Sequence, residues 1–142
     1  MLKPFKISEY KSKFSINWKL TMPNGCPPED IEVPDEHKFV RLTHDINGTL
    51  TEDDLLTYSE LYPDKDWGDK KFQSLGLSVN STVEAAKRLL KLPYIRNNNL
   101  QGAAELCLVP TDGVVKQTGK KTHYTWWQTT SYVISNYTPI AI

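Results

Sequence analysis

The stretch THYTWWQ, residues 122–128, lies near the C-terminus and contains two of the four tryptophans and one of the three histidines of the chain. It follows a turn-like Gly-Lys-Lys and is predicted to be a β-strand. Side chains alternate between the two faces of a strand, so His123 and Trp127 are expected to point one way and Tyr124 and Trp126 the other. Two tryptophans on opposite faces require either a core on both sides of the sheet or a partner that covers one indole.

Turn signals beside this stretch predict antiparallel pairing in the C-terminal part of the chain. Asp112-Gly113 is a strong hairpin signal between strands expected at residues 104–109 and 114–118. A further strand is expected over residues 132–137. Because hairpin-length connections join antiparallel neighbours, this region is predicted to be a strand-rich, antiparallel part of a sheet.

Apolar runs in the earlier part of the chain predict three more strands. They cover residues 14–20, where apolar and polar side chains alternate, and the short apolar segments 38–43 and 75–79. These strands are separated by segments with helical patterns, so strands and helices share one chain without a regular repeat.

Two helices are predicted between the strands. The first begins at Thr51, where acidic residues suit the positive end of a helix dipole, and is ended by Pro63. The second covers residues 82–92, with Ser81 and Glu84 as its capping box. The predicted fold class is therefore α+β, with a mainly antiparallel sheet, two main helices and a strand-rich C-terminal part.

A break in the pattern divides what is otherwise one domain of 142 residues. Residues 23–36 contain four prolines, an Asn-Gly turn signal and five acidic side chains. They are interpreted as an acidic, proline-rich loop or arm that contributes little to the core. The arm separates an N-terminal strand element, residues 1–22, from a main α+β body, residues 37–142.

Composition argues for an ordinary globular protein. Seventeen basic and seventeen acidic side chains give a formal net charge of zero, so a nucleic-acid partner is not favoured. The N-terminus lacks the apolar core of a signal peptide, and no apolar run is long enough for a membrane span. A soluble, intracellular, cytoplasmic protein without a membrane partner is expected, with Cys26 and Cys107 reduced.

The sequence contains none of the familiar patterns for metal or nucleophilic chemistry. Its three histidines and two cysteines have no recognisable zinc-ligand spacing, and the acidic segment from Asp64 lacks the glutamate that closes a calcium loop. Neither a glycine-rich phosphate loop nor a nucleophile elbow is present. These patterns predict neither a metal nor a cofactor.

The C-terminal hairpin is the strongest candidate for a contact surface. Lysines beside aromatic side chains in residues 116–127 can hold single-stranded nucleic acid, but the same pattern suits a solvated turn next to a core, and zero net charge favours the second interpretation. Exposed Trp and Tyr side chains also serve protein contacts. The partner-binding residues predicted here are His123, Tyr124, Trp126 and Trp127.

Three short pieces of sequence resemble a known family in their order and residue types. The pieces FVRLT, LGLSVNST and AELCL contain Arg41, Ser78 and Glu105 respectively. In this arrangement the chain resembles the ADP-ribosyltransferase superfamily. The resemblance implies that Arg41 holds NAD, that Ser78 lies in the polar step before a helix, and that Glu105 is catalytic and stabilises the positive charge developing on the nicotinamide ribose.

Three hypotheses about function follow. The first is a small interaction domain without a complete catalytic set, which binds another protein or a second copy of itself through an aromatic surface. The alternative is an NAD-using ADP-ribosyltransferase-like enzyme, or a degenerate relative, with Arg41, Ser78 and Glu105 as site residues. A second alternative is single-stranded nucleic-acid binding by the hairpin.

Overall fold

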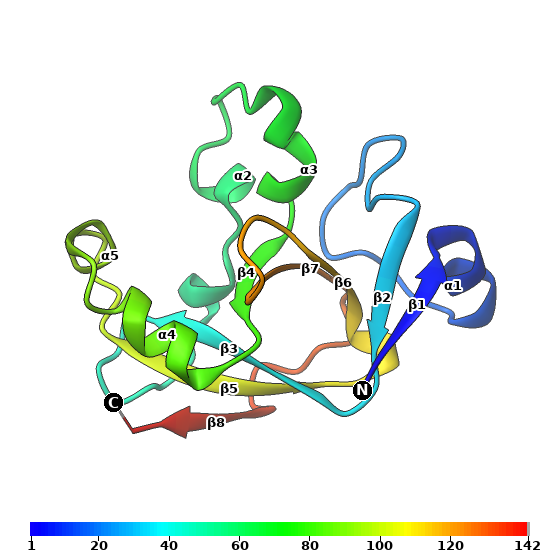
Figure 1. Cartoon of the computed structure of the whole chain (residues 1–142). Coiled ribbons are helices and arrows are strands. Elements are labelled where there is room, and N and C mark those ends of the chain that lie inside the picture. The colour runs from blue at the N-terminus through cyan, green and yellow to red at the C-terminus, as the bar shows by residue number, and fades with distance from the viewer. Residues whose placement is uncertain (142) are drawn as a thin grey trace.

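An antiparallel sheet forms the body of the protein in the computed structural model, which describes residues 1–141 (Figure 1). Within these residues the sheet has eight strands: β1 (Leu2–Lys6), β2 (Asp30–Pro34), β3 (His37–Thr43), β4 (Leu77–Asn80), β5 (Gly102–Leu108), β6 (Gly113–Gln117), β7 (His123–Gln128) and β8 (Tyr137–Ile140). Their spatial order is β1-β2-β6-β7-β4-β3-β5-β8, and every pairing is antiparallel. The sheet is curled, so that the direction of β1 and β2 makes a steep angle with that of β3, β5 and β8 (Figure 1).

Short helices connect and cover the strands. The α-helices are α1 (Ile7–Lys13), α2 (Tyr58–Leu61), α3 (Lys71–Ser74), α4 (Val83–Leu89) and α5 (Pro93–Asn97), and the 3-10 helices are η1 (Glu52–Leu55), η2 (Gly68–Lys70) and η3 (Pro110–Asp112). The predicted α+β class and the mainly antiparallel sheet are confirmed. None of the helices in residues 1–141 is long and apolar enough to span a bilayer.

Both faces of the sheet are buried, and we name them after the two adjacent tryptophans. The Trp126 face carries one continuous apolar cluster that includes Phe39, Val79 and Leu106. The Trp127 face is covered in two places, near Trp127 by α1 and the chain that follows it, and over β3 and β5 by α4 and α5. A sheet covered on both faces can therefore accommodate a large apolar residue at every position of a strand.

The N-terminal region differs from the prediction in two ways. Residues 14–20 are not a strand, although Trp18 makes an isolated bridge to Thr129. Their alternating apolar side chains instead pack as irregular chain against the Trp127 face. Part of the expected proline-rich arm is strand β2, which pairs with β1 and β6 and buries Ile31 and Val33. The acids that alternate with these two residues lie on the other side of β2, which is why charge and core burial coexist there.

The first predicted helix is broken in two. Thr51 and Asp54 do form a capping box, but the 3-10 helix η1 that they begin ends at Leu55. The backbone of Leu56 is extended, and Thr57 then caps α2 by accepting a hydrogen bond from the backbone N–H of Glu60. A second cap so close to the first starts a new helix in another direction.

The second predicted helix begins one residue later than expected and ends three residues earlier, at Leu89, and a separate helix begins at Pro93. Thr82, and not Ser81, is the N-cap of α4, because its hydroxyl accepts the backbone N–H of Ala85 at 3.1 Å. Pro93 then begins α5 as its first residue, a position where the missing N–H of proline costs nothing.

The C-terminal region confirms one hairpin and corrects two other expectations. β6 and β7 pair as predicted, with Val114 opposite Trp127. Asp112-Gly113, however, does not join neighbouring strands, because β5 pairs with β3 and β8 while β6 pairs with β2 and β7. The last strand begins only at Tyr137, and residues 132–136 form a turn that packs Tyr132 edge-on against Trp126.

Candidate functional site

Trp126 and Trp127 are both core residues. Their relative exposures are 0% and 1%. The indole N–H of Trp126 donates to the carbonyl oxygen of Asp112 at 3.1 Å, and that of Trp127 donates to the carbonyl oxygen of Phe72 at 2.9 Å. The expectation that one of them is available to a partner is therefore wrong, because the sheet is covered on both faces.

His123 and Tyr124, the other two residues predicted to bind a partner, are partly exposed and also make contacts within the chain. His123 Nδ1 lies 2.7 Å from the carbonyl oxygen of Thr118, across the β6–β7 turn. The ring of Tyr124 packs on Phe39 with 5.2 Å between centroids, and burial raises the pKa of its hydroxyl. The His123 contact lies within the β6–β7 hairpin, and the Tyr124 contact packs β7 against β3.

Arg41 does not share a cleft with Ser78 or Glu105. Arg41 is paired in register with Ala104 and points to the Trp126 face, whereas Glu105 is paired with Val40 and points to the Trp127 face. Ser78 also points to the Trp127 face, because it alternates with Leu77 and Val79 of the Trp126 face. Glu105 instead lies 3.7 Å from the ammonium group of Lys38 on the surface.

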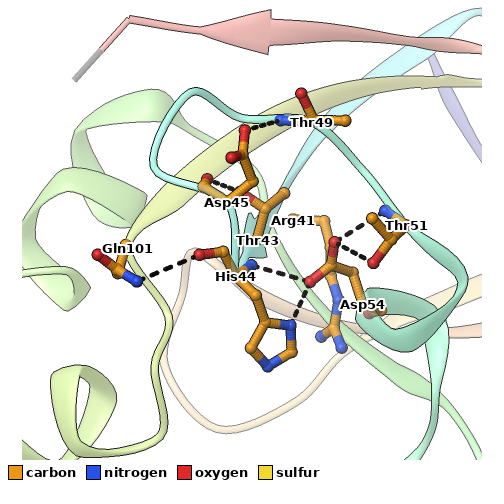
Figure 2. A network of polar contacts seen from close by, with 8 residues as sticks. All are labelled: Arg41, Thr43, His44, Asp45, Thr49, Thr51, Asp54 and Gln101. Carbon is orange, nitrogen blue, oxygen red and sulfur yellow. Dashed lines mark hydrogen bonds and ion pairs between the residues drawn. The ribbon is translucent and has the colours of Figure 1, made fainter.

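A polar centre, which we define as Arg41, His44, Thr51 and Asp54, lies at the end of β3 (Figure 2). Its middle is the buried carboxylate of Asp54. One carboxylate oxygen accepts the backbone N–H of His44 at 2.9 Å and lies 2.6 Å from the imidazole Nδ1 of His44. The other accepts the backbone N–H of Thr51 at 2.9 Å and its hydroxyl at 3.2 Å. A buried carboxylate needs such a full set of donors.

Arg41 supplies the second half of this centre. Its Nε donates to the backbone carbonyl of Asp54 and its Nη1 to the backbone carbonyl of Ser78, each at 2.8 Å. Burial lowers the pKa of the guanidinium, against the opposing influence of Tyr58 and Asp54, but arginine remains charged in proteins. Arg41 thus binds the chain immediately before and immediately after the segment 56–76.

The imidazole of His44 is the only part of the polar centre with the features of a proton-transfer group. Its side chain is 48% exposed while its carboxylate partner is fully buried. A carboxylate at Nδ1 fixes the orientation of the ring and directs the other nitrogen outward. Within residues 1–141, however, no hydroxyl or thiol is hydrogen-bonded to the His44 ring, so a nucleophile-base pair is not formed.

The segment 56–76, which we call the excursion, carries an exposed aromatic patch. It contains α2, η2 and α3 and stands out from the sheet (Figure 1). Tyr58, Leu61 and Tyr62 are 52%, 47% and 51% exposed. The ring of Trp67 lies 5.8 Å from that of Tyr58 and 6.5 Å from that of Tyr62, between centroids, and the ammonium group of Lys65 lies 4.3 Å from the Trp67 centroid. These five residues are the aromatic patch.

The excursion is held at its base by polar contacts. In addition to the Arg41 bonds, the hydroxyls of Ser59 and Ser74 lie 2.6 Å apart and join α2 to α3. Lys19 reaches from the N-terminal region to the carbonyl oxygen of Leu55 at 3.4 Å. The excursion is a shaped projection whose aromatic side chains are presented to solvent.

Acidic side chains lie close in sequence to the aromatic patch. The excursion, residues 56–76, contains four acidic and three basic side chains, and Asp64 and Asp66 flank Lys65. The acids are not arranged as a metal site, since no group of three or more His, Cys, Asp or Glu side chains within residues 1–141 is placed to hold an ion. Asp64 and Asp66 are exposed and place negative charge next to Lys65 and Trp67 in the chain.

The chain was compared with protein-family models, with curated proteins and with solved structures. None of the three comparisons found a match.

Sequence patterns pointed to a different aromatic group from the one that is exposed. Tyr58 begins α2, and Tyr62 follows its last residue, Leu61. A single helix from Thr51 to Pro63 would give Tyr58 to the same apolar surface as Leu55 and Leu56, but the extended backbone at Leu56 breaks that helix, and both tyrosines are exposed. The pairing of His44 with Asp54 across ten positions has no sequence signature, because it depends on how η1 returns to the end of β3.

Proposed function

We propose that this chain is an interaction domain that binds a basic segment of another protein through the aromatic patch. The observation that carries the proposal is a cluster of three exposed or half-exposed aromatic rings on a projection, with a lysine ammonium group held over one of the rings. Tyr and Trp are the residues most enriched in binding hot spots, and they supply contact area at little conformational cost.

The contact between Lys65 and Trp67 favours a basic partner. An ammonium group 4.3 Å from the ring centroid shows that the indole face accepts a cation. Lys65 is exposed and free to move aside, so a lysine or arginine of the partner can take its place. Acidic side chains nearby, such as Asp64 and Asp66, then attract the rest of a basic segment.

Trp67 also has an unused donor. Its indole N–H is buried and has no hydrogen-bond acceptor within residues 1–141. A buried donor without an acceptor destabilises a protein. A partner carbonyl satisfies this donor only where binding opens the edge of the ring, because Lys65 lies over its face.

The two alternatives from the sequence have less support. An NAD-using enzyme of the expected kind requires Arg41 and Glu105 in one pocket, and they point to opposite faces of the sheet. Single-stranded nucleic acid requires exposed rings on the β6–β7 hairpin, where the two tryptophans are buried.

A pair of synthetic peptides tests the proposal. One is a twelve-residue peptide of alternating arginine and serine, and the other has glutamine in place of arginine. We expect titration calorimetry of the intact chain to detect the arginine peptide alone. Trp67→Ala should weaken this binding at least tenfold, while Tyr94→Ala, which removes an exposed ring from α5, should leave it unchanged.

Three results would contradict the proposal. They are the absence of arginine-peptide binding, equal binding of both peptides, and equal effects of Trp67→Ala and Tyr94→Ala. Sedimentation of the protein without peptide provides a further test. A concentration-dependent dimer that Trp67→Ala abolishes would assign the patch to a second copy of the chain and remove the basic partner from consideration.

A further inference from the structure

A separate hollow lies beside α4 and α5, away from the aromatic patch. Its volume is about 670 Å³, within the range of small-molecule pockets. The lining combines the end of the second helical region with the loop after β3: Ile46, Lys87, Leu90, Lys91, Arg96, Asn99, Leu100 and Gln101.

Three basic side chains and no acidic one line this hollow. Lys87 belongs to α4 and Lys91 lies two residues beyond its end, and both line the hollow. Neither they nor Arg96 form an ion pair with a carboxylate in residues 1–141. Asp45 is adjacent in sequence to a lining residue, but its carboxylate accepts the backbone N–H groups of residues 47 and 49.

The guanidinium of Arg96 is oriented by one hydrogen bond to the backbone. Its Nε donates to the carbonyl oxygen of Leu90 at 3.2 Å, which leaves the terminal nitrogens free. An arginine that is oriented in this way presents paired donors that match two oxygens of a phosphate. Lys87 and Lys91 add two mobile positive charges on the neighbouring turn.

The rest of the lining is apolar. Leu90 and Leu100 belong to the cluster that α4 and α5 form over β3, and Ile46 is 62% exposed at the rim. A second hollow of about 570 Å³ shares Ile46 and Gln101 and extends toward Pro139 and Ile140 of β8. A ligand with an anionic end thus also finds apolar surface for its other part.

We propose that this hollow binds a small organic phosphate. Its phosphate lies among Lys87, Lys91 and Arg96, and its apolar group packs against Ile46, Leu90 and Leu100. The combination of concentrated positive charge, a preoriented arginine and an adjoining apolar wall carries the proposal. A concave site of this volume suits a compact ligand better than an extended polymer.

Three related probes test which features of a ligand the hollow recognises. AMP carries a phosphate and a flat aromatic base whose face can pack on apolar side chains, adenosine lacks the phosphate, and inorganic phosphate lacks the base. We expect AMP to shift the backbone amide signals of α4 and α5 in NMR spectra of the labelled full chain and to bind at least tenfold more tightly than either other probe. Binding that is equal for AMP and inorganic phosphate would overturn the organic part of the proposal.

Substitutions in α4 and just after it locate the site. Lys87→Gln with Lys91→Gln should weaken AMP binding at least tenfold, whereas Arg88→Gln, which removes an exposed charge beside the hollow, should change it less than twofold. All three positions are exposed, so the variants should keep the thermal midpoint of the parent. Equal effects of the two variants would show nonspecific attraction, and no AMP binding at millimolar concentration would remove the site. Trp67→Ala should leave AMP binding unchanged, which separates this test from that of the aromatic patch.

Discussion

Asp54 and Ser78 are joined by one side chain. The guanidinium of Arg41 accepts no bonds and donates two, to the backbone carbonyl of Asp54 and to that of Ser78, each at 2.8 Å. Asp54 lies just before the excursion and Ser78 just after it, so the two ends of a projecting segment are fixed by a residue of β3. The aromatic patch owes its fixed position to this arrangement.

Replacing Arg41 should loosen the excursion before it unfolds the sheet. Arg41→Lys keeps the charge but cannot donate to both carbonyls from one planar group, so we expect a loss of about 1–3 kcal/mol in the free energy of unfolding. Hydrogen exchange should accelerate at the amides of Leu61 and Tyr62, whose bonds close the turns of α2. Arg88→Lys, on the exposed side of α4, is the control and should change neither quantity.

The two core tryptophans should respond alike to truncation. Trp126→Ala and Trp127→Ala each remove a fully buried indole and should destabilise the protein by about 3–5 kcal/mol in urea unfolding. Trp67→Ala, on the excursion, should cost less than about 1 kcal/mol. A variant at either core position with an unchanged urea midpoint would mean that this indole lies outside the core.

The buried thiol of Cys26 should make stability sensitive to alkaline pH. Burial raises the pKa of Cys26 to about 11, whereas an unfolded cysteine titrates near about 8.5. The folded state therefore holds this proton more strongly, so its stabilising contribution is complete below about pH 8.5 and declines as the pH rises toward 11. Urea midpoints should fall between pH 8 and pH 10, and less so in Cys26→Ala.

Thiol labelling provides the independent check. Cys107 is exposed on β5, so iodoacetamide at pH 8 should modify it much faster than Cys26. Equal labelling rates for the two thiols in the folded chain would contradict the burial of Cys26. A midpoint that does not change between pH 8 and pH 10 would contradict the assigned pKa.

The sequence predicted the fold class well because local signals agreed with each other. Alternation in residues 122–128 and the turn before them identify a strand in a hairpin, and β6 and β7 form it. The two adjacent tryptophans required either a core on both faces or a partner, and the structure has a core on both faces. The strand in the proline-rich segment could not be predicted from local signals, because prolines and acids surround the alternating Ile31 and Val33. The strand forms because this segment pairs with β1 and β6.

The candidate sites depend on contacts that no local pattern contains. Lys87 and Lys91 look like the solvated side of a helix until α5 brings Arg96 beside them. His44 meets Asp54 only because η1 returns to the end of β3. In each case the chemistry results from two elements whose relative position is set by burial of their apolar residues elsewhere, so residue type and spacing alone could not reveal it.

The strand order has a consequence for the way in which a growing chain can fold. β6 and β7 lie between β2 on one side and β4 on the other, and they end at Gln128. On a ribosome, the β1–β2 pair and the β3–β4–β5 group therefore emerge without the strands that connect them. Both must wait, with unpaired edges, until Gln128 has left the exit tunnel, and the sheet then closes at its middle.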